Sequence, residues 1–187
     1  FVSVRLPCLR QAVSGVDINL EQAWKTYGNG NHDTIVAMID TGIDYTHEDL
    51  KDTLWVNTDE IPGNGIDDDG NGYVDDVYGW NFYNNNNQIF NGEEDSHGTH
   101  GAGTISAGTG NGIGIAGIVP GNRVRVMALK ALGGTDGGGS TAAVIKAIRY
   151  AEDNGAVICN LSLTSTVDDK ALYEAMKNSS MLFVVAA

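Results

Sequence analysis

Two short strings hold residue types that are suited to acid–base chemistry. Asp40 ends the apolar run TIVAMID, residues 34–40, and is followed by Thr-Gly. His97 opens the string HGTHGAGT, which is rich in small residues. An aspartate at the carboxyl end of a buried strand can accept a hydrogen bond from an imidazole. An imidazole oriented in this way can act as a general base.

Residue types alone leave other interpretations of both strings open. The D-T-G string also occurs in aspartic proteases, and an aspartate at a strand end is often only a turn residue. His97 could cap a helix, or it could share a zinc ion with His100, three residues later. A zinc site needs further ligands, and the sequence has no H-E-x-x-H motif and no further Cys/His pair.

The order of the two strings resembles the Asp and His boxes of the subtilases, the subtilisin-like serine proteases. The resemblance continues through Gly117–Pro120, Leu132–Gly134 and Asn160–Leu163. It implies a three-layer α/β fold with a mostly parallel sheet. It also implies that Asp40 orients the imidazole and that His97 is first the general base and then the general acid. His100 is expected to belong to the packing of its helix.

We expect two parts in the chain. The resemblance covers about residues 17–187, which are expected to form a partial subtilisin-like peptidase domain. Residues 1–16 do not match the family and form an N-terminal segment without an assigned role.

The resemblance also implies two walls of a substrate cleft, and therefore a peptide or protein substrate as partner. One wall is the edge segment that pairs with an extended substrate, here Gly137, Gly138 and Gly139. The opposite wall is Ser162, Leu163 and Thr164. Glycine lets a substrate strand approach the backbone closely and form main-chain hydrogen bonds. Family members usually have glycine where this sequence has Thr164, so we expect a specificity pocket of different shape.

The family's remaining catalytic groups do not occur in these 187 residues. The oxyanion-hole asparagine is expected about three residues past Ala187, and the G-T-S-M-A box with the nucleophilic serine some sixty residues later. We therefore expect a fold truncated before the last strands and the serine-bearing helix. In subtilisin, loss of the serine lowers turnover by about 10⁶. The chain alone is expected to be inactive as a serine endopeptidase.

Three functional hypotheses follow. The first is half of a calcium-dependent endopeptidase whose remaining half, with the serine and the asparagine, is absent, cleaved away or on another chain. The second is a truncated subtilase or pseudoprotease that binds calcium or peptides. The third, a separate α/β binding domain, has no positive support in the sequence.

The string DDDGNGYVDD, residues 67–76, has the pattern of a calcium-binding loop. Oxygen ligands alternate along it and a glycine allows the sharp turn that wraps the ion. The expected ligands are Asp67, Asp69, Asn71, the carbonyl of Tyr73, and Asp75 or Asp76. An EF-hand would need glutamate where Tyr78 stands. A solvated acidic loop is the alternative, but five neighbouring aspartates repel one another without a cation.

The resemblance alone implies a second calcium site. Its ligands would be Asp49, the Asn111 side chain, and the carbonyls of Ile113 and Ile115.

Composition restricts the partners of the chain. The net charge of −13 disfavours binding to nucleic-acid phosphates and suits Ca²⁺. No apolar run approaches the ~18 residues needed to span a bilayer. We expect a secreted or cell-surface protein whose signal is not in this chain. The two cysteines, Cys8 and Cys159, do not form a disulfide framework, and Cys159 lies in an apolar run where a buried thiol is expected.

Hydrophobic periodicity predicts alternating strands and helices. Strands are expected at 34–40, 77–83, 124–132, 156–163 and 181–187, and helices at 17–27, 97–108, 140–154 and 167–179. Asp17 and Ser140 are the expected N-caps, and Gly28 and Gly155 the expected stops. This alternation indicates a mostly parallel sheet. An exposed edge of that sheet would favour a homodimer or pairing with a complementing half.

Overall fold

The computed structural model describes residues 18–28, 30, 32–121 and 123–186. Its centre is a five-stranded sheet, ordered β2-β3-β1-β6-β7, in which every pair of neighbours is parallel. The strands are β1 (Thr34–Asp40), β2 (Gly79–Asn81), β3 (Val124–Lys130), β6 (Ile158–Leu161) and β7 (Leu182–Val185). The predicted parallel α/β fold is confirmed.

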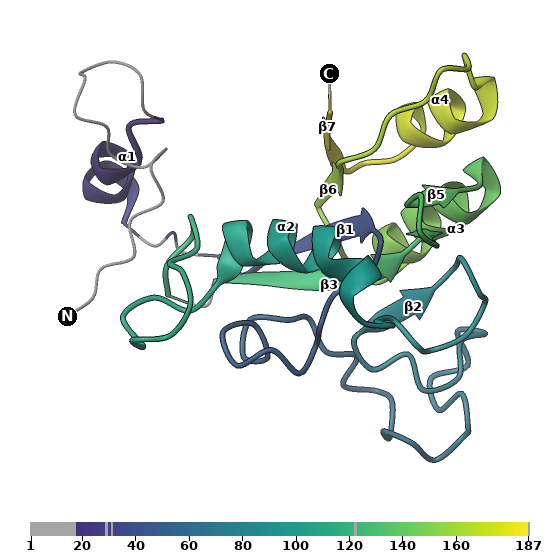
Figure 1. The fold of residues 1–187 in the computed structure, drawn as a ribbon, viewed down its shortest axis with the longest axis horizontal. Coiled ribbons are helices and arrows are strands. Elements are labelled where there is room, and N and C mark those ends of the chain that lie inside the picture. The colour runs from purple at the N-terminus through teal and green to yellow at the C-terminus, as the bar shows by residue number, and fades with distance from the viewer. Residues whose placement is uncertain (1–17, 29, 31, 122, 187) are drawn as a thin grey trace.

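Helices cover both faces of this sheet, because successive side chains of a strand point to opposite sides. Val36 and Met38 of β1 join a cluster with Ala102 of α2 (Ser96–Ser106). Ala37 and Ile39 join a second cluster, with α3 (Thr141–Asp153). The result is a three-layer arrangement, with α2 and α3 on opposite faces of the sheet (Figure 1).

Of the two remaining helices, one joins the layer of α3 and the other lies apart from the layers. Helix α4 (Lys170–Lys177) lies beside α3, and α1 (Leu20–Tyr27) lies at the far end from α4 (Figure 1). The Trp24 indole of α1 donates a hydrogen bond to the Ile118 carbonyl. No helix in the described part of the chain is long and apolar enough to cross a membrane.

The predicted helix ends follow from local hydrogen bonding. The Ser140 hydroxyl accepts from the Ala143 N–H, which confirms it as the N-cap of α3. Gly28, with φ of 62°, ends α1 as predicted, and its N–H donates to the Trp24 carbonyl. Asp17 lies outside the described residues, and α1 begins three residues later, after Asn19 in a left-handed conformation.

Two of the predicted strands are shorter in the structure. The strand expected at 124–132 ends at Lys130, and Leu132–Gly133 forms β4, which pairs antiparallel with β5 (Gly138–Gly139). The strand expected at 77–83 is shortened to β2, residues Gly79–Asn81. The chain turns back after β2, so that Asn81 and Asn86 exchange backbone hydrogen bonds.

Helix α2 packs closely on its neighbours at its glycines, but it is not buried on all sides. Only one face of α2 is buried, and it contains Gly98, Ala102, Gly103 and Ser106. His100 is exposed and does not belong to the packed face.

Candidate active site

Asp40 and His97 form a hydrogen-bonded pair. Asp40 Oδ1 lies 2.7 Å from His97 Nδ1. Asp40 is completely buried, whereas the His97 side chain is 62 % exposed. An ionised carboxylate only accepts hydrogen bonds, so Nδ1 of a neutral His97 carries the proton and Nε2 keeps its lone pair. The pair therefore presents a basic nitrogen on an accessible ring.

Two elements fix the geometry of this pair. Asp40 is the last residue of β1, and the Thr41 N–H donates to Asp40 Oδ1 at 2.7 Å. His97 lies in the first turn of α2, and the next residue, Gly98, donates its N–H to the Thr41 hydroxyl. A Cβ atom at Gly98 would lie 2.2 Å from the carbonyl oxygen of Gly42. Only glycine therefore lets α2 approach the Asp40 turn this closely.

The pair lies at a cleft of about 650 Å³. The cleft is lined by both predicted substrate-binding segments, Gly137, Gly138, Gly139 and Ser162, Leu163, Thr164, together with His97. Gly138 and Gly139 are exposed in β5, and Thr164 is exposed on the other side. The structure thus brings together residues that are widely separated in the sequence, in an arrangement that could admit an extended peptide beside the imidazole.

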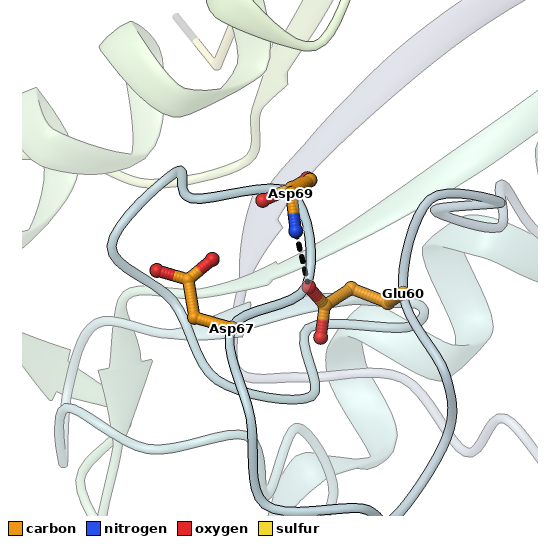
Figure 2. Close-up of side chains that lie close together, drawn as sticks. All are labelled: Glu60, Asp67 and Asp69. Atoms are coloured by element: carbon orange, nitrogen blue, oxygen red, sulfur yellow. Dashed lines mark hydrogen bonds between the residues drawn. The ribbon is translucent and has the colours of Figure 1, made fainter.

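The acidic loop between β1 and β2 holds a cluster of three carboxylates, Glu60, Asp67 and Asp69, shown in Figure 2. One carboxylate oxygen from each lies within 4.8 Å of the others. Glu60 is buried, and one of its oxygens accepts the N–H groups of Asp68 and Asp69. Three converging hard oxygen donors fit a hard divalent cation.

The other expected ligands of this loop have different partners in the structure. Asn71 lies beside the cluster, and its side-chain amide donates to Asp69 and Asp76. The Asp75 carboxylate accepts the N–H groups of residues 63–65. The Tyr73 N–H donates to the Asn71 side chain. The ligand roles of Asn71, Tyr73, Asp75 and Asp76 remain predictions.

The second predicted calcium site also has its residues close together. Asp49 is buried, and its carboxylate accepts hydrogen bonds from the Asn111 side chain at 2.7 Å and the Ile115 N–H at 3.0 Å. The Ile113 N–H donates to the Asn111 side chain. The structure therefore gathers Asp49 with the loop that contains Asn111, Ile113 and Ile115.

Sequence reasoning missed Glu60. This residue precedes the aspartate run by seven positions and stands in the string NTDEIPGNG, which carries no metal-ligand spacing. The available signal was a glutamate before a Pro/Gly turn, since such a turn can fold back on the loop that follows.

Cys159 lies in β6 with a buried thiol, as expected. Burial raises the pKa of this thiol to about 12, so it stays protonated at neutral pH. Cys8 lies outside the described residues.

Comparisons with known proteins agree with the fold. The family model of the subtilase family matches residues 31–187. The chain is 36% identical over 164 residues to subtilisin-like protease 1 of Plasmodium berghei (strain Anka), covering 85% of this chain and 26% of that protein. It is 36% identical over 155 residues to the major intracellular serine protease of Bacillus subtilis (strain 168), covering 81% and 41%. It is 33% identical over 174 residues to thermitase of Thermoactinomyces vulgaris, covering 91% and 52%. The chain thus spans about a quarter to a half of these relatives.

Proposed function

Because the chain belongs to the subtilase family, we propose that it supplies the Asp–His half of a serine endopeptidase active site. Asp40 would be the orienting carboxylate and His97 the general base. The observation that carries this proposal is the 2.7 Å contact between buried Asp40 and His97 at the cleft. The nucleophilic serine and the oxyanion asparagine, which the family resemblance places after Ala187, would come from a complementing C-terminal half.

The geometry favours separate roles for Asp40 and His97. Asp40 Oδ1 accepts from both the Thr41 N–H and His97 Nδ1, so the imidazole is held in one tautomer. His97 Nε2 would take the proton of a serine hydroxyl as it attacks the peptide carbonyl. The resulting imidazolium is stabilised by the Asp40 carboxylate and then gives the proton to the leaving amine.

Substrate would bind as an extended strand in the cleft. The exposed backbone of Gly138 and Gly139 offers an edge for main-chain pairing, and Ser162 to Thr164 form the facing wall. Thr164 places a branched side chain at the cleft, so we propose that the adjacent subsite prefers a smaller substrate side chain than a pocket lined by glycine.

Calcium is part of the proposal. Glu60, Asp67 and Asp69 would hold the first ion, with Asn71, Tyr73, Asp75 or Asp76 as further ligands. Asp49, Asn111, Ile113 and Ile115 would hold the second. A bound Ca²⁺ would neutralise the acidic loop and hold its backbone in place. No proton transfer in the reaction involves either ion.

We also propose where a complementing half would bind. Strand β7 is at the edge of the sheet, and Leu182, Val184 and Val185 are exposed there by 63%, 51% and 48%. Such an edge invites pairing with another strand. A second copy of the chain is the competing occupant, and light scattering distinguishes a homodimer from a heterodimer. Export from the cell is a further part of the proposal. Detection of the 19.8 kDa species in the culture medium would test it.

The experiment for the catalytic proposal begins with the intact mass of the sample under denaturing conditions. Peptide hydrolysis is then measured for the chain alone and with the polypeptide encoded downstream. The proposal predicts no turnover for a single species of 19.8 kDa and turnover when a serine-bearing polypeptide is present. No turnover in the complemented sample would contradict it.

The second candidate function is a catalytically inactive subtilase that binds peptides or calcium. The cleft and the carboxylate cluster favour it, because neither needs the serine. Peptide binding by the chain, together with no hydrolysis in the complemented sample, would support this alternative.

A further inference from the structure

A buried ion pair lies directly behind the candidate catalytic pair. Lys130 Nζ and Asp95 Oδ1 are 2.6 Å apart, and their side chains are 1% and 0% exposed. Removing two charges from water costs several kcal/mol per ion, and well-packed apolar residues often replace such pairs without loss of stability. Stability alone is therefore a weak explanation for this pair.

Every polar atom of the pair has a partner. The ammonium of Lys130 donates to Asp95 Oδ1 and to the carbonyl oxygens of Thr41 at 2.5 Å and Leu132 at 3.1 Å. A lysine has three donors, and all three are used. Asp95 Oδ2 accepts the Asn91 N–H at 2.7 Å.

These partners belong to three segments that build the cleft. Thr41 directly follows Asp40, and Asp95 precedes His97 by two residues. Leu132 lies in β4 and pairs with Gly139 of the candidate substrate edge. Lys130 itself is the register partner of Asp40 on the adjacent strand. One ammonium thus joins the turn after Asp40, the start of the His97 helix and the substrate-binding hairpin.

We propose that Lys130 and Asp95 are a positioning pair for the Asp40–His97 couple. Hydrogen bonds from the ammonium fix the backbone on either side of the couple, and the Asp95 carboxylate neutralises the ammonium. An uncompensated cation at this place would disfavour the imidazolium that His97 must form. This inference rests on the proposed function, because it assigns the pair a role in the same site.

Several charged groups lie on the elements around His97 or line the same cleft. Asp40 faces it from β1, Asp95 and Glu94 precede it in η1 (Glu93–Asp95), and Lys130 ends β3. Asp136 and Asp169 line the same cleft. Lys130 is the cationic side chain among these groups, so the loss of Asp95 leaves an unpaired positive charge behind the couple.

The test is an NMR titration of the four histidines in the 187-residue chain. The variants are Asp95→Asn, Lys130→Met, and the charge-neutral double variant. His100 is the internal control, because it is exposed on the same helix. The exchange rate of the His97 Nδ1 proton with water is measured in parallel, because it reports the hydrogen bond to Asp40.

Asp95→Asn is expected to lower the pKa of His97 by about half a unit or more, because an unmatched positive charge disfavours the imidazolium. The pKa of His100 is expected to stay unchanged. The double variant restores charge balance and is expected to return the His97 pKa toward the wild-type value. It lacks the ammonium hydrogen bonds, so its His97 Nδ1 proton should exchange about tenfold faster.

An unchanged His97 pKa in Asp95→Asn, with unchanged proton exchange in the double variant, would overturn the inference and leave the pair a structural role only. Where a single variant does not fold, the exchange rate of the His97 Nδ1 proton in the double variant decides. Faster exchange supports the inference, and an unchanged rate overturns it. Asp40→Asn tests the proposed function separately. If His97 responds to Asp40→Asn but not to changes in the pair, only the positioning role fails.

Discussion

The Tyr150 phenol donates a hydrogen bond to Asp76 Oδ2 at 2.5 Å, and both side chains are buried. Tyr150 lies in α3, and Asp76 ends the acidic loop. Asp76 also accepts hydrogen bonds from the side-chain amides of Asn57 and Asn71. This carboxylate therefore anchors the acidic loop to helix α3.

Replacing Tyr150 with phenylalanine should destabilise the chain. Burial, followed by the hydrogen bond to Asp76, raises the pKa of Tyr150 well above its usual value, so the phenol stays a donor. Tyr150→Phe leaves Asp76 with one donor fewer and should lower the free energy of unfolding by about 1–3 kcal/mol. Urea unfolding measures this, with exposed Tyr173→Phe as the matched control. Equal losses in both variants would contradict the anchoring role.

Calcium should raise the unfolding midpoint through the carboxylate cluster. A ligand that binds only the folded state stabilises it by about 2.7 kcal/mol at a hundred times its Kd. Glu60 accepts backbone N–H groups and Asp67 accepts those of Asn71 and Gly72, so substitution also costs stability without metal. The relevant quantity is therefore the increase in the unfolding midpoint that calcium produces in each variant.

Glu60→Gln and Asp67→Asn should reduce this increment, and exposed Asp52→Asn should keep it. Thermal unfolding with Ca²⁺, Mg²⁺ or EGTA measures it. The same increment in Glu60→Gln as in the wild type would rule out this cluster as the site.

The acidic loop shows what sequence can predict and what it cannot. The aspartate run indicated a cation site because clustered charge and glycine turns are local properties. Glu60 enters the cluster only through the fold of the loop, which returns the residues after Pro62 toward it. Asp75 and Asp76 look alike in sequence, yet Asp75 accepts the N–H groups of an exposed turn and Asp76 is buried against Tyr150.

Low pH should weaken the contact between Thr141 of α3 and Asp169, the N-cap of α4. Hydrogen bonds from the Thr141 hydroxyl and then the Leu172 N–H hold the pKa of Asp169 below its usual value. A carboxyl with a lowered pKa stabilises the folded state above its unfolded-state pKa. That contribution is lost as the pH falls through the folded-state pKa.

The unfolding midpoints of the wild type and Asp169→Asn should therefore differ at pH 7 and converge below pH ~4, the ordinary aspartate range. Urea unfolding across this pH range measures both midpoints. A difference that stays constant with pH would contradict the assignment.

Cys159 should resist alkylation in the folded chain. Its pKa of about 12 leaves almost no thiolate at pH ~8, and thiolate is the reactive form. Iodoacetamide followed by peptide mapping should label Cys159 in urea and not in buffer, with Cys8 read from a separate peptide. Rapid labelling of Cys159 in buffer would contradict its burial in β6.

The parallel sheet was predictable because most of its strands, such as β1 and β3, are continuous apolar runs. The hairpin of β4 and β5 was not, since two-residue strands leave no periodic signal. Asp40 and His97 were found from their strings, because each sits at the end of an element. Lys130 and Asp95 were missed, since nothing in the sequence indicates that two charged residues 35 positions apart are buried together.

The most direct test of the account compares His97→Ala with His100→Ala in the complemented, serine-containing sample. Both residues lie on α2 and both are exposed, but only His97 contacts Asp40. Loss of the general base should lower kcat by about 10⁴–10⁶, whereas His100→Ala should change it by no more than about threefold. Equal kcat values for the two variants would contradict the assignment of His97 as the base.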